Sequence, residues 1–346
     1  MGLIEHAEKT GAYMPNQRDV AKAAGVSTAS VSRYLANPES VSPVRSKRIQ
    51  KAIESLSYKV DTAAQTLKTG RSHHISIFIP GSAPFYWMIM QSIQQRLSEA
   101  GYYSSVLFTR QFDSAIPYNN SMVHKLVYSN QIEAFIIFPL LTGEDQALTN
   151  SIRRLHERVL VVDSVPEDER IPHLLFDNYG AGKQAAFEMA KKGHKKFLLL
   201  TGDDIFRSSV DRKTGFLDGL KEEGIEIPED NIIHTSFTAA VAFPQLINSI
   251  LPDFTAVLAP NDTTAIAFLR AAQMKGLSCP KDFQLVSFDN NREYSPYTTP
   301  AITSFEQPLY DAGLKVAELT LAMIEGTELP LRTTFPLKLI KRESFH

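Results

Sequence analysis

The sequence predicts an α/β protein in which a small all-α helix-turn-helix head precedes a two-lobed, doubly wound body. Residues 18–36 have the spacing of two short helices joined at a glycine. From residue 74 onward, apolar runs alternate with helical segments, which is the pattern of a parallel sheet covered on both faces. These runs are too numerous for one comfortable core, so we expect two lobes.

The head is predicted from the stretch RDVAKAAGVSTASVSRYLA at residues 18–36. Gly25 permits the left-handed backbone that ends a helix, and the Ser27 hydroxyl can accept a free backbone N–H at the start of the next one. Val31 and Leu35 share the inner face of this second helix because they are four residues apart. An ordinary helical hairpin has the same spacing, but a helix-turn-helix places its second helix in the DNA major groove. The residues on the outer face are Thr28, Ala29, Ser32 and Arg33.

A third helix and a linker complete this part of the chain. Ser42 and Pro43 mark the helix start, because proline is well tolerated at the first helical position. The sequence of residues 61–73 then predicts a linker with a helix that is too short to be stable by itself. The apolar residues of the third helix recur with helical spacing and are Ile49, Ala52, Ile53 and Leu56.

Most strand-like runs of the body are apolar throughout, as expected for parallel strands that are buried on both faces. Helical segments separate most of them, for example residues 84–100 and 178–192. This alternation predicts a doubly wound architecture. The runs occupy residues 75–80, 103–108, 133–139, 158–163, 173–177, 196–200, 255–259 and 283–288.

Composition indicates a globular protein of a reducing compartment. Of the 346 residues, 43% are hydrophobic and 21% are charged. Cys279 is the only cysteine, which excludes an internal disulfide. The sequence has neither an apolar stretch of membrane-spanning length nor the apolar core of a signal peptide near its N-terminus. We therefore expect a cytoplasmic protein without membrane contact, in which residues 1–14 form a tail.

Charge is unevenly distributed along the chain. The net charge of −2 divides into +6 for residues 15–71, with ten Lys and Arg against four acids, −1 for residues 1–14 and −7 for the rest. A basic head on an acidic body is typical of a nucleic-acid-binding protein. A charged segment is more often only a solvated face, but here it coincides with the helix-turn-helix.

The head resembles the DNA-binding signature of the lactose-repressor (LacI/GalR) family of bacterial transcription regulators. The blocks D-V-A, A-G-V-S and V-S-R stand at residues 19–21, 24–27 and 31–33. Ser30 and Ala36 depart from the common pattern. The resemblance continues to the C-terminus and implies a periplasmic-binding-protein-like effector domain, a palindromic double-stranded operator and a homodimer. It also implies a bacterial, nucleoid-associated protein.

The resemblance also implies a domain division. The head comprises residues 15–60, a hinge comprises residues 61–73, and the effector-binding and dimerisation domain comprises residues 74–346. Lobe 1 is expected at about residues 74–170 and 306–332, and lobe 2 at about residues 171–305 and 333–346.

DNA-contacting residues follow from the resemblance residue by residue. In the family, the hinge helix orders on operator DNA and inserts a leucine into the minor groove, and Leu67 matches that position. Gln65 stands where an arginine is common, and Val60 and Asp61 replace a common Pro-Asn pair. A plain linker is the alternative for this segment. The predicted DNA-binding residues are Thr28, Ala29, Ser32, Arg33, Gln65 and Leu67.

Polar and aromatic residues follow the carboxyl ends of several predicted strands, where open α/β sheets bind ligands. Carboxylates, amides, an arginine and aromatic faces suit a polyhydroxylated ligand. Ser164 stands where many family members have arginine, and Trp87 suits either sugar stacking or packing. The positions that match the family's effector site are Phe85, Tyr86, Asp163, Arg212, Asn261, Asp289 and Gln307.

The leading hypothesis is a DNA-binding transcription regulator, a repressor, controlled by a small carbohydrate effector. A purine corepressor is the alternative effector, since Phe85 and Tyr86 could stack on a base. An α/β enzyme is disfavoured because the sequence has no G-x-G-x-x-G, Walker-type or nucleophile-elbow motif. A secreted sugar-binding protein would not carry the head. No H-x-x-x-H pair or cysteine set suggests a metal, so we expect no metal, no cofactor and no catalytic residues.

Overall fold

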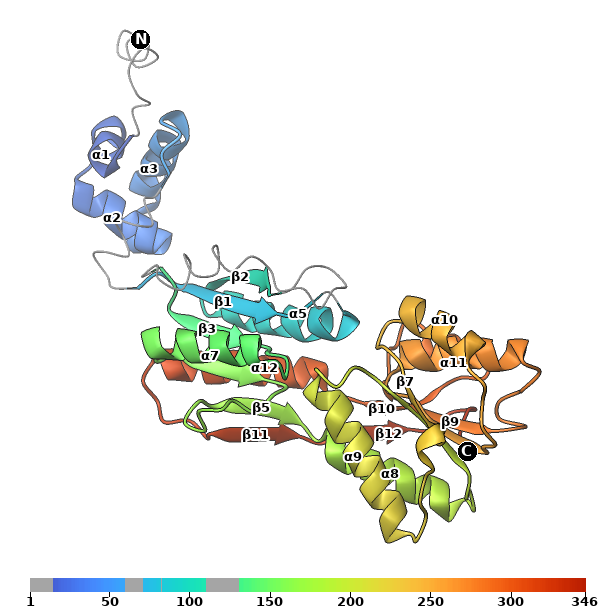
Figure 1. Cartoon of the computed structure of the whole chain (residues 1–346). Coiled ribbons are helices and arrows are strands. Elements are labelled where there is room, and N and C mark those ends of the chain that lie inside the picture. The colour runs from blue at the N-terminus through green and yellow to red at the C-terminus, as the bar shows by residue number, and fades with distance from the viewer. Residues whose placement is uncertain (1–14, 60–70, 82, 110–130) are drawn as a thin grey trace. The chain divides into compact units, whose positions relative to one another are not determined.

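The computed structural model describes residues 15–59, 71–81, 83–109 and 131–346. The chain divides into two compact units, Met1–Ser72 and His73–His346, and each is considered by itself. Figure 1 shows the helical head and the two sheets of the body. The predicted tail and residues 60–70 of the hinge lie outside the described residues.

The head is a three-helix unit around a small apolar core. Val20, Val31 and Ile49, one from each helix, are fully buried against one another. Gly25 adopts φ 61° where the first helix ends, and Ser27 Oγ accepts the Ser30 N–H at 3.2 Å, as the sequence predicts. The helices are α1 (Gln17–Ala24), α2 (Thr28–Ala36) and α3 (Pro43–Ser55), with a short 3-10 turn, η2 (Pro38–Ser40), between α2 and α3.

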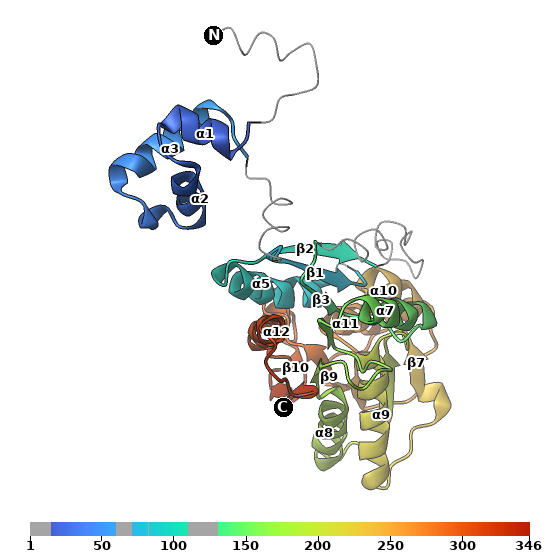
Figure 2. The same cartoon turned by 90° about the vertical axis from the view of Figure 1, so that its left-hand side faces the viewer.

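The first lobe of the body is built on a six-stranded, all-parallel sheet with the order β11-β5-β4-β3-β1-β2. Helices of the described residues cover both faces of this sheet (Figure 2), where strand side chains pointing to opposite faces form two apolar clusters. The strands are β1 (His74–Ile79), β2 (Tyr103–Phe108), β3 (Ala134–Ile137), β4 (Val159–Val162), β5 (His173–Phe176) and β11 (Arg332–Phe335). The helices are α5 (Pro84–Glu99) and α12 (Leu309–Ile324) on one face and α7 (Gly143–Leu155) on the other.

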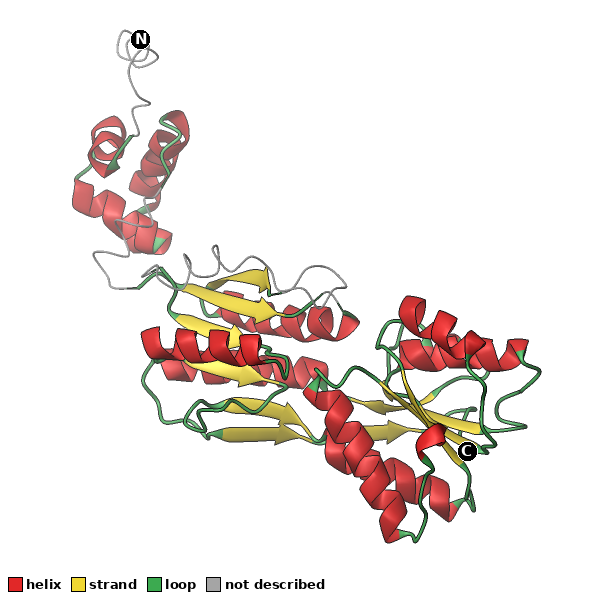
Figure 3. Cartoon of the chain, viewed as in Figure 1, coloured by secondary structure: helices red, strands yellow, loops and turns green. Residues whose placement is uncertain are grey.

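The second lobe has a six-stranded sheet with the order β12-β10-β9-β8-β6-β7, in which only β12 runs antiparallel to its neighbour. Figure 3 shows helices on both sides of the strands of the body. The strands are β6 (Phe197–Thr201), β7 (Ile232–His234), β8 (Ala256–Leu258), β9 (Gln284–Asp289), β10 (Thr303–Glu306) and β12 (Lys338–Ile340). The helices are α8 (Asn178–Lys191) and α9 (Arg207–Glu222) on one face, α10 (Ala239–Asn248) and α11 (Asp262–Met274) on the other, and the 3-10 turns η3 (Glu229–Asn231) and η4 (Ser295–Tyr297).

The expected lobe boundaries need correction. We expected lobe 2 to begin near residue 171 and to resume at residue 333, but β5 and β11 pair with each other in the first sheet. The chain therefore enters lobe 2 after Phe176, returns to lobe 1 between Glu306 and Leu309, and enters lobe 2 again after Phe335. An apolar run predicts a strand but not the sheet to which the strand belongs, because strand pairing depends on segments far away in the sequence.

Four strands were not among the predicted runs, namely β7, β10, β11 and β12. Their sequences are short, and β10 (TSFE) and β11 (RTTF) are largely polar. Short or polar segments of this kind lack the apolar run by which the other strands were predicted. Among the described residues, no helix is both long and apolar enough to cross a membrane.

Candidate functional site

The outer face of α2 presents the residues predicted to contact DNA. Thr28, Ala29 and Arg33 are exposed and Ser32 is half-buried, whereas Val31 faces the head core. Arg33 Nε donates to the Ala29 carbonyl at 3.4 Å, so the guanidinium lies along the outer surface of the helix. This face is polar and cationic, as a recognition helix requires.

Arg48 has a role that the sequence did not reveal. Arg48 is exposed on α3, and its Nη2 donates to the Gly25 carbonyl at 3.2 Å. This contact ties α3 to the turn between α1 and α2. Gln65 and Leu67, the two predicted hinge contacts, lie outside the described residues.

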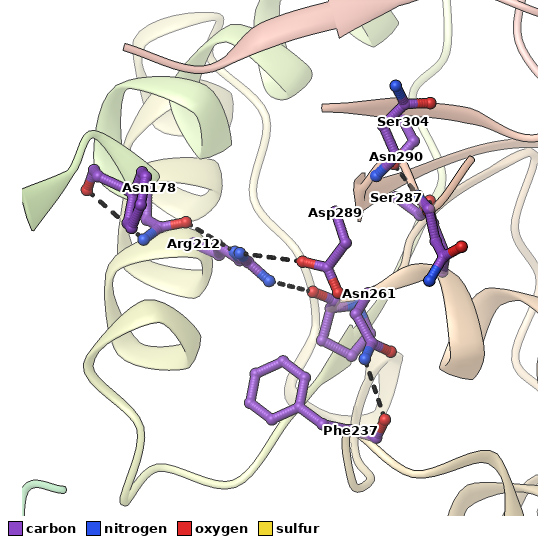
Figure 4. Close-up of polar contacts among 12 residues, drawn as sticks. Asn178, Arg212, Phe237, Asn261, Ser287, Asp289, Asn290 and Ser304 are labelled. Atoms are coloured by element: carbon purple, nitrogen blue, oxygen red, sulfur yellow. Dashed lines mark hydrogen bonds and ion pairs between the residues drawn. The ribbon is translucent and has the colours of Figure 1, made fainter. Parts of the chain in front are cut away.

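Arg212 of α9 is the centre of the polar cluster in lobe 2 (Figure 4). Its side chain is almost fully buried, and Nε donates to Asn178 Oδ1 at 2.8 Å while Nη1 donates to the Pro260 carbonyl at 2.6 Å. Nη2 lies 3.5 Å from Asp289 Oδ1, and the guanidinium carbon lies 4.4 Å from the centre of the Phe288 ring. Three elements far apart in the sequence thus fix this guanidinium.

Burial acts on both members of the Arg212–Asp289 pair. It lowers the pKa of Arg212, an effect opposed by Asp289, Asp163 and Asp262. It raises the pKa of Asp289 to about 6, although the Arg212 charge pulls that pKa down. Asp289 ends β9 with φ 96°, a left-handed conformation that only a few per cent of non-glycine residues adopt. This turn directs its carboxylate toward Arg212.

Asp163 supplies a carboxylate from lobe 1. It follows β4 with φ 58°, and burial raises its pKa to about 7 despite the nearby charge of Arg212. Asp211 and Asp289 raise that pKa further. The segments that follow β3 and β6 meet between the lobes, where the Leu141 N–H donates to the Ile205 carbonyl at 2.7 Å.

Tyr86 and Phe85 begin α5 beside this carboxylate. Tyr86 is buried, and burial followed by the charges of Asp163 and Asp145 raises its pKa well above the usual value. Phe85 is half-buried and packs edge-on against Tyr86 and Phe176, with ring centres 5.2 and 5.8 Å apart. Both rings therefore also belong to the packing of lobe 1.

Asn261 is engaged mainly in local structure. Its Oδ1 accepts the Thr264 N–H at 2.9 Å and so caps α11, and its Nδ2 donates to the Phe237 carbonyl at 2.9 Å. Its neighbour Asp262 is fully buried and accepts hydrogen bonds from Ser287, Ser295, Ser304 and the Asn291 N–H. This carboxylate therefore connects α11 to β9, which ends at Asp289, and also to β10 and η4.

Five buried side-chain oxygens have no hydrogen-bond partner within the described part of the chain. One belongs to the predicted site residue Gln307 and another to Ser164, beside Asp163. The others are Gln146 Oε1, Ser209 Oγ and Gln284 Oε1. Gln307 is 5% exposed and follows β10, while Ser164 follows Asp163 and is fully buried. Buried polar atoms are normally satisfied, so an unpaired one is suited to a ligand.

The sequence did not point to several residues of this region. Asp177 caps α8 by accepting the Gly180 N–H, and its neighbour Asn178 accepts a hydrogen bond from Arg212. Phe206 and Phe237 pack edge-on with ring centres 5.2 Å apart, at the carboxyl ends of β6 and β7. No sequence pattern pairs two aromatics 31 residues apart.

Comparison with known proteins identifies both parts of the chain. The description "Bacterial regulatory proteins, lacI family" matches residues 17–61, and "Periplasmic binding protein-like domain" matches residues 187–345. The chain belongs to the lacI family. A curated lacI-family relative, the HTH-type transcriptional regulator CelR of Thermobifida fusca, is 27% identical over 95% of this chain and 98% of its own length.

Two solved structures share the fold of this lacI-family chain. The Lac repressor dimer bound to operator and an anti-inducer superposes with a TM-score of 0.80 at 22% identity, covering 96% of this chain and 99% of that one. A CelR–cellobiose complex gives a TM-score of 0.70 at 23% identity, covering 95% and 99%. The protein is thus a DNA-binding transcriptional regulator and not an enzyme.

Proposed function

We propose that the protein is a repressor whose operator affinity is controlled by an uncharged sugar bound between the two lobes. The observation that carries this proposal is the buried Arg212, held by Asn178, Pro260 and Asp289 at the end of the second sheet and facing Asp163 of the first. A guanidinium fixed in this way presents its donors without further loss of side-chain freedom.

The chemistry of this region suits hydroxyl groups. Carboxylates of Asp163 and Asp289 accept from hydroxyls, and the unpaired oxygens of Gln307 and Ser164 can accept as well. The Phe206–Phe237 pair offers apolar surface for the carbon face of a sugar ring. A known CelR structure contains cellobiose, which supports a carbohydrate for a related chain.

Charge favours a neutral sugar over a phosphorylated one. Arg212 is already paired with Asp289, and Arg207 donates to both carboxylate oxygens of Asp211 at 2.8 and 2.9 Å. Asp163 adds a further carboxylate, so a phosphate bound here would lie near more acidic side chains than unpaired basic ones. Burying such an anion beside carboxylates is unfavourable.

Isothermal titration of the full chain with cellobiose, glucose, glucose 6-phosphate, adenosine and hypoxanthine tests the effector class. We expect a neutral sugar to bind, and Arg212→Ala to weaken that binding about tenfold or more, as loss of charge-assisted hydrogen bonds implies. Operator affinity without ligand should survive in the same variant. Unchanged sugar affinity in Arg212→Ala would remove Arg212 from the site.

A purine corepressor is the second candidate, because Phe206 and Phe237 could also stack on a base. In that case hypoxanthine would bind and would raise operator affinity, whereas a sugar inducer lowers it. The direction of this effect distinguishes the two, since a ligand shifts an equilibrium only toward the state that it binds better.

A homodimer is part of the proposal. Large apolar side chains are exposed on α5 and α12 of lobe 1, with Trp87 52%, Met88 41% and Tyr310 53% exposed. A two-fold dimer matches a palindromic operator, because each recognition helix reads one half-site. Sedimentation of wild type and of Trp87→Glu at micromolar concentration tests this, with a dimer expected for the former and dissociation for the latter. Such a regulator acts on bacterial DNA in the cytoplasm.

A further inference from the structure

The body of the protein begins at a residue whose backbone is held from two sides. His73 precedes β1 with φ 53°, a left-handed value that is uncommon for a residue with a side chain. Its N–H donates to Glu133 Oε1 at 2.6 Å, and its carbonyl accepts the Tyr103 N–H at 3.0 Å. Both backbone polar groups of His73 are therefore paired before the strand starts.

Glu133 is the centre of this arrangement. It is only 9% exposed, and its Oε2 accepts the Tyr102 hydroxyl at 3.4 Å. Its own N–H donates to the His74 carbonyl at 2.8 Å, which places it on the opposite side of the chain from Tyr103. Burying a carboxylate is unfavourable unless hydrogen bonds compensate, and a bond from a backbone N–H to a carboxylate is among the stronger ones.

Ring contacts also hold the His73–His74 segment against the residues at the start of β2. The His73 and Tyr102 rings lie 5.1 Å apart, and the His74 and Tyr103 rings stack at 4.6 Å with an interplanar angle of 14°. His74 Nε2 also lies 2.9 Å from Ser105 Oγ. We call His73, Tyr102 and Glu133 the entry clamp, since together they fix the first residue of the body.

We propose that Glu133 is a positioning residue for operator recognition, because it fixes where and in which direction the segment leading from the head joins the body. Two heads must reach half-sites about one helical turn apart. If the His73 backbone could adopt several conformations, specific binding would have to select one of them and would lose conformational entropy. Non-specific phosphate contacts can form from several of these conformations. The inference rests on the proposed reading of a two-fold operator.

The test uses the full-length protein and a duplex selected by the wild type from random DNA. Affinities for this duplex and for a scrambled duplex of equal length are measured at matched salt. Glu133→Ala is expected to lower affinity for the selected duplex about tenfold, on the scale of hydrogen bonds to a charged group, and to leave the scrambled duplex unchanged. Unchanged affinity for the selected duplex, or equal losses on both, would overturn the proposal.

Controls separate the clamp from charge and from folding. Glu157→Ala removes an exposed carboxylate from the same lobe and is expected to bind like the wild type. Glu133→Gln keeps an acceptor for the His73 N–H and should retain most of the affinity, so a loss equal to that of Glu133→Ala would contradict the hydrogen-bond argument. If Glu133→Ala does not fold, Glu133→Leu, of similar volume, is measured instead.

Different results would contradict the two proposals, namely that a dimer recognises a two-fold operator and that Glu133 positions the entry clamp. A selected duplex without two-fold symmetry would contradict the dimeric reading of DNA. The ratio of the two affinities still reports on Glu133 with any duplex that the wild type selects.

Discussion

At the scale of single residues, Asp163 is a carboxyl group whose ionisation opposes folding. Burial raises its pKa to about 7, whereas an unfolded chain gives an aspartate a pKa of about 3.9. The folded state therefore binds the proton more tightly than the unfolded state. Its contribution to stability is present below the unfolded value and is lost as pH rises through the folded value.

Asp163→Asn should accordingly stabilise the protein in a pH-dependent manner. The gain in the free energy of unfolding should grow from about pH 4 to about pH 7 and stay constant above, because asparagine does not ionise. Urea unfolding of both proteins between pH 4 and pH 8.5 measures this. Asp168→Asn is the control of opposite sign, since hydrogen bonds from Arg170 lower the Asp168 pKa. A pH-independent difference for Asp163→Asn would contradict the assignment.

Arg33 should read bases rather than phosphates. It is exposed on α2, and an arginine can donate two hydrogen bonds to guanine, which is worth roughly 1–3 kcal/mol of discrimination. Arg33→Ala should therefore relax the preferred sequence at one position of each half-site. Lys47→Ala on α3 is the comparison, since loss of a phosphate contact weakens all sequences alike and reduces the salt slope by about one unit or less. Selection from random DNA with each variant gives the answer, and an unchanged preference for Arg33→Ala would rule out base reading.

At the scale of elements, α8 and α9 pack so closely that only glycine fits between them. A Cβ on Gly215 would lie 2.0 Å from the Tyr179 carbonyl oxygen, and one on Gly182 would lie 2.4 Å from the Arg212 carbonyl oxygen. These helices carry Asn178 and Arg212, so their separation sets the hydrogen bond between the two side chains.

Gly215→Ala should force the two helices apart. We expect a loss of about 1–3 kcal/mol in the free energy of unfolding, the usual range for overpacking, together with weaker effector binding. Gly143→Ala at the start of α7 is the matched control, because a Cβ there meets nothing within 4 Å. Urea unfolding of the wild type and the two variants measures these free energies. Equal stability of Gly215→Ala and wild type would mean that the helices can shift without strain.

At the scale of the whole molecule, Leu67 is predicted to couple effector to operator. An apolar side chain wedged between base pairs costs a few kcal/mol of unstacking, which the contacts to kinked DNA offset. A hinge helix this short should form only when two hinges meet on the operator, so an effector that separates them withdraws the wedge. Leu67 lies outside the described residues, and its role stays a prediction.

Leu67→Ala should lose much of the specific affinity while non-specific binding, which is mostly phosphate charge, stays close to wild type. The remaining specific binding should also respond less to effector. Operator and random-DNA affinities at matched salt, with and without the sugar found by titration, provide the measurement. Equal losses on both DNAs would indicate that Leu67 supports folding instead.

The sequence by itself determined the features that short segments encode. The turn at Gly25, the cap at Ser27 and the inward Val31 depend on residues within one helical turn, and the structure has each of them. Eight strands were predicted from short runs, most of them apolar throughout, since a parallel strand covered on both faces is expected to be apolar. The helix-turn-helix and the two-lobed α/β fold followed from these local signals.

Only the tertiary structure decided which distant groups meet. The sheet membership of β5 and β11, the contact of Arg48 with Gly25 and the partners of Arg212 each join segments more than 20 residues apart. The family resemblance predicted Arg212 and Asp289 as site residues, and the structure pairs them, whereas the contact of Asn178 with Arg212 and the Phe206–Phe237 pair had no signal in the sequence. Local spacing limits which faces a residue can occupy, whereas long-range packing determines what lies opposite it.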